Sequence, residues 1–279
     1  MKLEQIRELY RSYVDEDASS EDFEKVCLSE KPLRAAIEAY LKETPHPEPE
    51  FYSIASNFFR SEGEYARTEE LLKRWKKAKG NPITPVIHHA LLYFADDYIT
   101  YQECLTHIAE GLKQEPENPL LLTIAYHAAV EEKDAPRRLY YAGRLAAISA
   151  EANQQIIYGV ECGKNLMFDR AQEAFRKARE LDPNDVRAMH GLGMCRLKHL
   201  ELDEAQELFE ESHKVRETVL ATEALKTISR LRNGKLWSDE EKRLEKFWSE
   251  WTDSQLAEIK AEEQTRLLAE CFSASKPRK

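Results

Sequence analysis

Glycine and cysteine are scarce in this chain, and their scarcity argues against several classes of protein. Glycine occurs 9 times among 279 residues, which disfavours an α/β enzyme whose ligand loops are rich in glycine. The five cysteines lie far apart, at positions Cys27, Cys104, Cys162, Cys195 and Cys271. An odd number of widely spaced cysteines indicates reduced thiols rather than a disulfide framework. We therefore expect a cytoplasmic protein.

Long apolar runs and an amino-terminal signal are also missing from the sequence. No stretch of about 18 apolar residues occurs, so we expect neither a membrane span nor insertion into a membrane. The first residues are charged and no apolar segment follows them, which argues against a secretory signal. The net charge is −10. Nucleic acid is therefore an unfavourable partner, because its binding depends on neutralising phosphates.

Motifs for catalysis and for metal binding are lacking too. The patterns G-x-x-x-x-G-K-[ST], H-E-x-x-H and G-x-S-x-G do not occur. Gly191-Leu192-Gly193 has no third glycine and follows no predicted strand, so it does not indicate a nucleotide site. The neighbours His88 and His89 would point about 100° apart on a helix and could not readily share a metal ion. We predict no enzymatic activity, no cofactor and no bound metal.

What the sequence does contain is a segment that repeats after 34 residues. The segment Asp169–Phe175 reads DRAQEAF, and Asp203–Phe209 reads DEAQELF. Gly159 is matched by Gly193 at the same spacing. This pattern resembles the tetratricopeptide (TPR) repeat, a helix–turn–helix unit of 34 residues. The resemblance implies an all-α fold, a right-handed α-solenoid with two helices in each repeat.

The resemblance covers roughly residues 49–217. Small residues at the Gly and Ala positions would let helices approach closely, and large apolar residues would fill the space between them. The predicted repeats are 49–82, 85–117, 118–151, 152–185 and 186–217. Residues 1–48 are expected to form an N-terminal helical cap or a degenerate repeat, and residues 218–279 to form capping helices and a basic tail.

After residue 217 the pattern is lost from the sequence. We predict a helix that ends at Arg232, a capping box of Ser238 and Glu241 that opens the next helix, and a last helix from about Asp253 to Phe272. A second apolar face is predicted on these helices, made by Trp237, Phe247, Trp248 and Trp251. Two interpretations stay open: this face seals the last repeat, or it contacts a partner.

In TPR proteins the first helices line a concave groove, where ligands usually lie. The resemblance implies that the groove-facing residues are Asn57, Arg60, His89, Tyr93, Leu122, Tyr126, Ile156, Val160, Lys164, His190, Met194 and Lys198. The heat-shock co-chaperone branch binds a C-terminal carboxylate with Lys, Asn and Arg at such positions. Only Asn57 matches that clamp, so we do not expect this ligand, although Lys164 and Lys198 are suitable cations. A mixed apolar and aromatic groove favours an amphipathic helix or an extended peptide.

From the resemblance we predict a non-catalytic adaptor or scaffold that binds a partner protein or peptide in the concave groove. One alternative is a chaperone for secreted or assembly-prone subunits, which would use the same groove. Another is a structural subunit that self-associates as a homodimer through the tryptophan face. The sequence also leaves open whether the chain's own terminal helices fill the groove.

Overall fold

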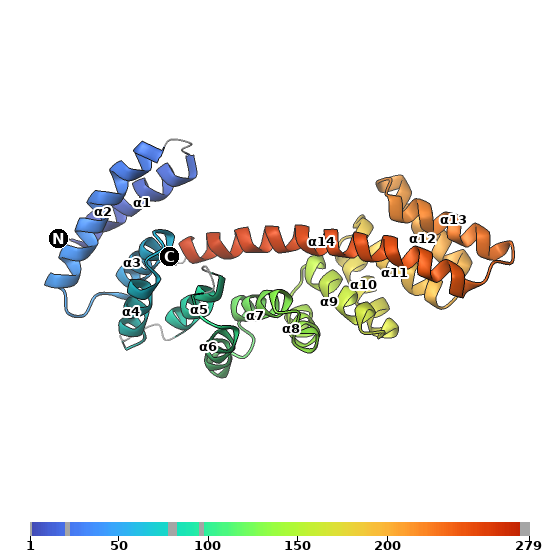
Figure 1. Ribbon diagram of the computed structural model, residues 1–279, viewed down its shortest axis with the longest axis horizontal. Helices are drawn as coiled ribbons and strands as arrows, with labels where there is room; N and C mark the ends of the chain where they lie inside the picture. The colour runs from blue at the N-terminus through green and yellow to red at the C-terminus, as the bar shows by residue number, and fades with distance from the viewer. Residues whose placement is uncertain (1, 20–22, 78–82, 95–97, 274–279) are drawn as a thin grey trace. The chain divides into compact units, whose positions relative to one another are not determined.

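The chain is described by a computed structural model, which defines residues 2–19, 23–77, 83–94 and 98–273. All regular structure in these ranges is helical (Figure 1). The helices are α1 (Leu3–Ser19), α2 (Phe23–Glu43), α3 (Pro49–Ser61), α4 (Tyr65–Lys76), α5 (Thr84–Leu91) with the 3-10 turn η1 (Leu92–Phe94), α6 (Tyr101–Gln114), α7 (Pro119–Glu131), α8 (Ala135–Ile148), α9 (Ala152–Lys164), α10 (Phe168–Leu181), α11 (Val186–Lys198), α12 (Leu202–Val215), α13 (Val219–Arg232) and α14 (Trp237–Ser273).

The chain divides into two compact units. Unit 1 comprises Met1–Ile124 with Leu267–Lys279, and unit 2 comprises Ala125–Arg266. Within each unit a helix packs mainly on its neighbours along the chain, for example α3 on α4, α9 on α10 and α11 on α12. This nearest-neighbour packing is that of an α-solenoid, and it confirms the predicted all-α class. Each of the five predicted repeats contains one pair of helices.

Several first helices end in the same hydrogen-bonded turn. In the α11–α12 turn, the Leu200 N–H donates to the Leu197 carbonyl at 3.0 Å and the Glu201 N–H to the Arg196 carbonyl at 3.0 Å, which is a Schellman motif. Equivalent turns place five residues in the left-handed region: Gly63 (φ 73°), Lys133 (φ 55°), Leu166 (φ 58°), Leu200 (φ 59°) and Gly234 (φ 80°). From residue 166 onward this turn recurs every 34 residues, at 200 and at 234. The structural repeat therefore continues through α13 into α14, although the sequence pattern is lost after residue 217.

The C-terminal segment differs from the prediction. A single helix, α14, spans Trp237–Ser273, so the predicted start of a separate helix near Asp253 is wrong. The Leu236 carbonyl accepts from the N–H groups of Asp239 and Glu240, at 3.2 and 3.3 Å, so α14 begins before Ser238 and the expected capping box does not form. No proline or glycine interrupts the helix between Trp237 and Ser273, and the sequence there has no strong stop signal.

Glycines on the first helices of unit 2 lie directly against phenylalanine rings. A Cβ on Gly159 or on Gly191 would lie only 2.8 or 2.5 Å from the ring of Phe175. A Cβ on Gly193 would lie 2.7 Å from the ring of Phe209. Both rings are fully buried. The Gly191-Leu192-Gly193 sequence is thus a packing feature, because each glycine makes room for a ring from a second helix.

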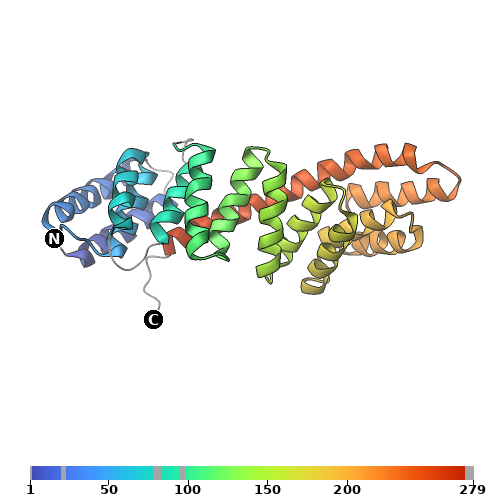
Figure 2. The same cartoon turned by 90° about the horizontal axis from the view of Figure 1, so that it is seen from below.

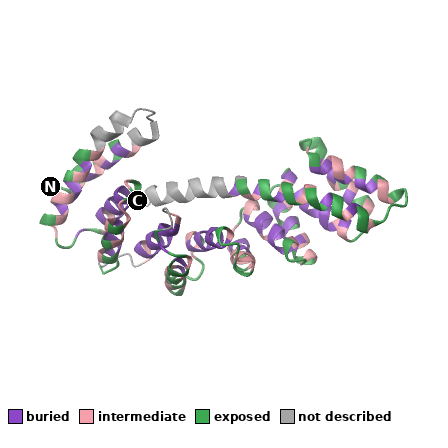
Figure 3. Cartoon of the chain, in the orientation of Figure 1, coloured by how far each residue is buried: buried purple, intermediate pink, exposed green. Residues whose placement is uncertain are grey.

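Unit 1 fills its core with aromatic rings instead. The Tyr52 and Trp75 rings stack with centroids 6.2 Å apart, and the Phe58 and Phe59 rings meet edge to face at 5.2 Å. Trp75 also contacts the imidazole of His88 at 5.5 Å. Nine successive residues of α3 are buried, so this helix is enclosed on every side (Figure 3).

Candidate binding surface on the first helices of unit 2

The predicted groove residues of unit 1 are mostly packed inside the unit. The side chains of Asn57, His89, Tyr93 and Leu122 are buried, and Arg60 is half-buried. His89 illustrates this environment. Its Nδ1 lies 2.9 Å from the Pro85 carbonyl, and its ring stacks on His107 at 4.7 Å. Burial lowers the pKa of His89 to about 4, so the imidazole is neutral near pH 7.

In unit 2 only two of the predicted groove side chains reach solvent to a substantial degree. The residues Tyr126, Ile156, Val160, His190 and Met194 are all buried. The side chain of Lys164 keeps 30% of its surface exposed, and that of Lys198 keeps 19%. These two lysines are therefore the members of the predicted set that a partner could contact without disturbing the core.

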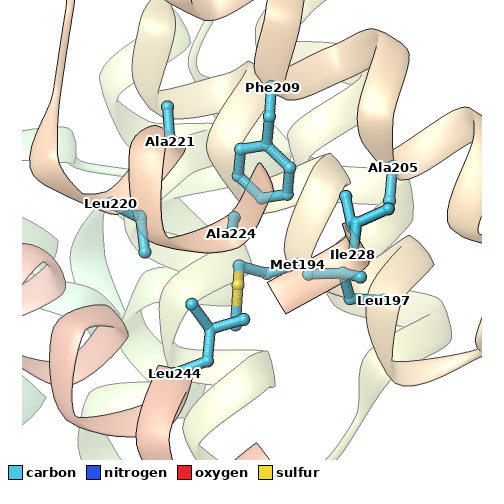
Figure 4. Packing of buried hydrophobic residues seen from close by; sticks show 9 residues of the cluster. All are labelled: Met194, Leu197, Ala205, Phe209, Leu220, Ala221, Ala224, Ile228 and Leu244. Carbon is cyan, nitrogen blue, oxygen red and sulfur yellow. The ribbon is translucent and has the colours of Figure 1, made fainter. Parts of the chain in front are cut away.

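The first part of α14 lies over the first helices of unit 2 (Figures 1 and 2). Leu244 of α14 is 1% exposed and belongs to one apolar cluster with Met194 and Leu197 of α11. Figure 4 shows the Met194 side chain beside Leu244. The rest of the cluster is Ala205, Phe209, Leu220, Ala221, Ala224 and Ile228, and Trp237, Phe247, Trp248 and Trp251 pack against it partly buried. The predicted groove and the predicted tryptophan face, treated as two surfaces from the sequence, meet in one interface.

Two ion pairs join α14 to the groove lysines. Lys198 Nζ lies 2.5 Å from Glu241 Oε1, and Lys164 Nζ lies 3.1 Å from Asp253 Oδ1. Lys198 Nζ is also 6.0 Å from the centroid of the Trp237 ring, within cation–π range. The carboxylates that meet the lysines come from 43 and 89 residues away in sequence. Sequence reasoning missed both, because acidic residues are frequent throughout the chain and no local spacing marks these two.

His190 connects three helices at the centre of this interface. Its Nε2 lies 3.1 Å from Ser212 Oγ of α12 and 3.2 Å from Thr218 Oγ1. The Trp251 ring of α14 meets the imidazole edge to face at 5.1 Å. Burial, and next the positive charge of Arg216, lower the pKa of His190 to about 4. The imidazole therefore acts as a neutral packing and hydrogen-bonding group near pH 7.

A cleft of about 260 Å³ remains between α14 and the helices beneath it. Its lining is largely apolar and includes Phe168, Phe175, Met194, Trp237, Leu244 and Trp248. Charged side chains at Lys164, Lys198, Glu241 and Glu245 also line it. Its volume falls just below the range of about 300–1,000 Å³ typical of small-molecule pockets. The cleft suits one or two bulky side chains of a partner better than a whole drug-sized ligand.

Comparison with known proteins relates the chain to solved structures. YrrB, described as a TPR protein with an unusual peptide-binding site, aligns with a TM-score of 0.52 and 17% identity over 68% of this chain and 96% of its own. The chain has the tetratricopeptide repeat fold. MamA from AMB-1 aligns with a TM-score of 0.48 and 17% identity over 61% of this chain and 93% of its own. MamA from Desulfovibrio magneticus RS-1, from residue 41 to its end, gives 0.46 and 20% over 61% and 97%. No family model and no curated protein matches the sequence.

A buried carboxylate lies among the TPR helices of unit 2. Glu161 of α9 is fully buried, with Oε2 at 3.4 Å from Arg138 Nε and Oε1 at 3.3 Å from the Tyr126 hydroxyl, which donates to it. Burial raises the pKa of Glu161, although the charge of Arg138 opposes the shift. Tyr126 was predicted to face the groove, but in the structure it hydrogen-bonds this carboxylate inside unit 2.

The cysteine side chains of the TPR helices are buried. Cys162 and Cys195 form no disulfide, and the Cys104 thiol lies 3.5 Å from the Ala90 carbonyl, whereas Cys27 and Cys271 lie where side chains are not described. Burial raises the pKa of the Cys195 thiol to about 12, so it stays protonated and unreactive near pH 7.

Among the described residues, no three or more His, Cys, Asp or Glu side chains converge as metal ligands. In the same ranges, every helix is too short or too polar to pass through a lipid bilayer.

Proposed function

We propose that this chain is a protein-interaction module that holds a segment of a partner protein on the first helices of unit 2. The observation that carries the proposal is the cleft of about 260 Å³ beside α9 and α11, with Lys164 and Lys198 among its lining residues. A concave, largely apolar site with a few charged groups is the usual form of a peptide-anchoring pocket. The likeness to YrrB, described as having a peptide-binding site, supports a peptide segment as the ligand.

The lining of the cleft indicates which partner side chain would enter it. Phe168 of α10 offers an aromatic ring, and Met194 of α11 offers a polarisable thioether that adapts to different shapes. The expected anchor is a bulky apolar or aromatic residue, flanked by polar residues that meet the charged side chains. The buried thiols of Cys162 and Cys195, which form no disulfide, support a reducing, cytoplasmic setting for this interaction.

Residues suitable for testing the proposal are exposed ones, because they can be substituted without disturbing the core. Ile156 and Val160 are 1% and 2% exposed, so a charge placed there would unfold unit 2 rather than block a surface. Leu166 lines the cleft and is 76% exposed, so its side chain can be enlarged without disturbing the core. Leu181 is 47% exposed and does not line the cleft, which makes it a matched control.

The test selects helical peptides from a displayed library on the full-length chain and measures their affinity for two variants. Leu166→Arg should weaken binding at least about tenfold, because the long cation obstructs the cleft, a loss typical of a central contact. Leu181→Arg should bind like the wild type. Equal affinity of the selected peptides for both variants and the wild type would refute this site.

A further inference from the structure

One face of α14 packs on the first helices of unit 2. This face is more polar than the buried face of α10, a second helix in one of the repeats. Thr252 and Gln255 of α14 are 1% and 6% exposed. Among the described residues, Oε1 of Gln255 has no hydrogen-bond partner, and such a buried polar atom is destabilising because it has lost its hydrogen bonds to water. The buried residues of α10, by contrast, are Ala171, Ala174, Phe175 and Ala178. Helix α14 therefore fits its site less well than α10 fits its own.

Charge contributes to holding α14 in place, and these contacts remain partly hydrated. The side chain of Glu241 is 34% exposed and that of Asp253 is 64% exposed in their pairs with Lys198 and Lys164. Exposed ion pairs of this kind contribute little to stability and weaken as salt is added. The lysines select for a helix that carries carboxylates at these places, without fixing it there permanently.

The packing beneath α14 is incomplete as well. The cleft of about 260 Å³ lies along its inner face, whereas the interior of a domain seldom leaves voids larger than a water molecule. Trp237, Trp248 and Trp251 stay only partly buried against the apolar cluster. Large aromatic residues that are half-covered, beside unfilled space, are characteristic of an exchangeable contact more than of a finished core.

From these observations we infer that α14 is the resident ligand of the first helices of unit 2, and that a partner replaces it with an acidic amphipathic helix of the same kind. The partner helix carries bulky apolar residues at i, i+4 and i+7, as α14 does at Leu244, Trp248 and Trp251. It carries carboxylates on either side of this stripe, as α14 does at Glu241 and Asp253. The inference rests on the proposed function and specifies its partner.

Competition with a tethered helix follows from this arrangement. A segment joined to its own site acts at an effective concentration in the millimolar range, so a free helix of equal intrinsic affinity displaces little of it. Weakening the contacts of α14 should therefore open the surface to a helix supplied in trans.

The experiment uses a fluorescent peptide of residues 237–259 and three full-length chains. In the opened chain, Glu241→Gln, Trp248→Ala and Asp253→Asn weaken the contacts that hold α14 in place. Fluorescence anisotropy should give a Kd for this chain at least about tenfold lower than for the wild type, because the tethered competitor is gone. Adding Lys164→Glu and Lys198→Glu to the opened chain should raise the Kd again by at least about tenfold, because the lysines that meet the peptide's carboxylates are reversed.

The matched control adds Lys177→Glu to the opened chain, because Lys177 pairs with Glu173 on α10 and does not line the cleft. Its affinity for the peptide should equal that of the opened chain. If the opened chain keeps wild-type helicity and melting but binds the peptide no better than the wild type, the inference is wrong. It is also wrong if the reversals at Lys164 and Lys198 affect binding no more than the control does.

A second measurement uses the wild-type protein, so its result does not depend on whether the variants fold. In native-state hydrogen exchange, the amides of residues 241–255 should exchange at least about tenfold faster than those in the middle of α11, because α14 detaches without global unfolding. Equal protection of α14 and α11 would overturn the inference. Selected partner peptides that bind the wild type and the opened chain equally well would leave the proposed function standing and refute the role of α14.

Discussion

Units 1 and 2 are built from the same kind of helix pair, but different side chains fill the space between their helices. In unit 2 a glycine on a first helix faces a phenylalanine ring, as Gly191 faces Phe175. In unit 1 rings meet rings, as Tyr52 stacks on Trp75. The first arrangement requires a specific small residue opposite a specific large one. The second lets several aromatic residues share the space, so the residue type at any one position is less constrained.

This difference explains why the repeat is visible in one unit and faint in the other. A glycine-against-ring contact must recur at the same place in each repeat, and it leaves matching residues 34 apart, such as Gly159 and Gly193. An aromatic cluster can be rearranged without changing the helix pair. The sequence of unit 1 has accordingly lost the pattern, while its helices have kept the arrangement.

The largest expected effect comes from removing a ring in unit 2. Phe175→Ala should lower the free energy of unfolding by about 3–5 kcal/mol, as for a fully buried phenylalanine. In the Phe175→Ala background, Gly191→Ala should cost nothing further, because its Cβ enters the vacated space. Urea denaturation of the single and double variants measures both values. A full additional loss in the double variant would show that the glycine is not required by the ring.

Acid should destabilise the two units to different degrees. The pKa values of His88 and His89 in unit 1 are lowered to about 3 and about 4, mainly by burial, and that of His190 in unit 2 to about 4. Between pH 6.5 and about 4 the unfolded chain binds more protons at these sites than the folded chain, so stability falls as the pH falls. At pH 5.5 each of these three histidines should cost about 1 kcal/mol. Burial also lowers the pKa of His107 in unit 1, so unit 1 should lose at least about twice as much as unit 2.

Hydrogen exchange at pH 7 and pH 5.5, resolved by segment, measures this difference. His190→Gln should abolish the loss in unit 2 and leave that of unit 1 unchanged. Equal acid sensitivity of both units would contradict the assignment.

A methyl group added to a glycine should have unequal effects in the two units. Gly191→Ala places a Cβ 2.5 Å from three atoms of the rigid Phe175 ring, and should cost about 1–3 kcal/mol through overpacking. Gly111→Ala in unit 1 places its Cβ 2.4 Å from Leu121 Cδ1, the end of a flexible side chain. Alanine has a higher helix propensity than glycine, by about 1 kcal/mol. At position 111 this gain should offset most of the cost of the steric clash. Thermal melts of both variants test this ordering, and a larger loss for Gly111→Ala would reverse it.

The smallest expected effect concerns the shared turn. Leu200 adopts a left-handed conformation while 53% exposed. Leu200→Gly should therefore stabilise unit 2 by a few tenths to about 1 kcal/mol, because it removes the steric cost of Cβ. The reciprocal change in unit 1, Gly63→Leu, should destabilise by about 1 kcal/mol. A shift of the melting temperature in the opposite direction in either variant would show that side-chain contacts outweigh the backbone conformation.

Much of the fold was predictable from the sequence, whereas the candidate site was predictable only in part. The 34-residue pattern of the last two repeats was sufficient to predict the all-α solenoid. Each repeat packs on its neighbours in the same way, so the same residue types return at the same spacing. The single helix α14 was predicted as two, since Ser238 and Asp253 resemble cap residues and nothing local shows that the chain continues through them. The meeting of Lys164 with Asp253 depends on a contact across 89 residues, and no sequence periodicity encodes such a pairing.

The turns at residues 166, 200 and 234 have a consequence for rebuilding the molecule. Each is closed by main-chain hydrogen bonds, and each holds a residue with positive φ at the same place. The three turns are therefore equivalent connections between helices. A 34-residue block between two of them can be deleted or duplicated, and the remaining helices are still connected by turns of this type. Residues 167–200 form one such block. A chain with a second copy of this block should melt as a longer array in which α14 still follows a Gly234-type turn.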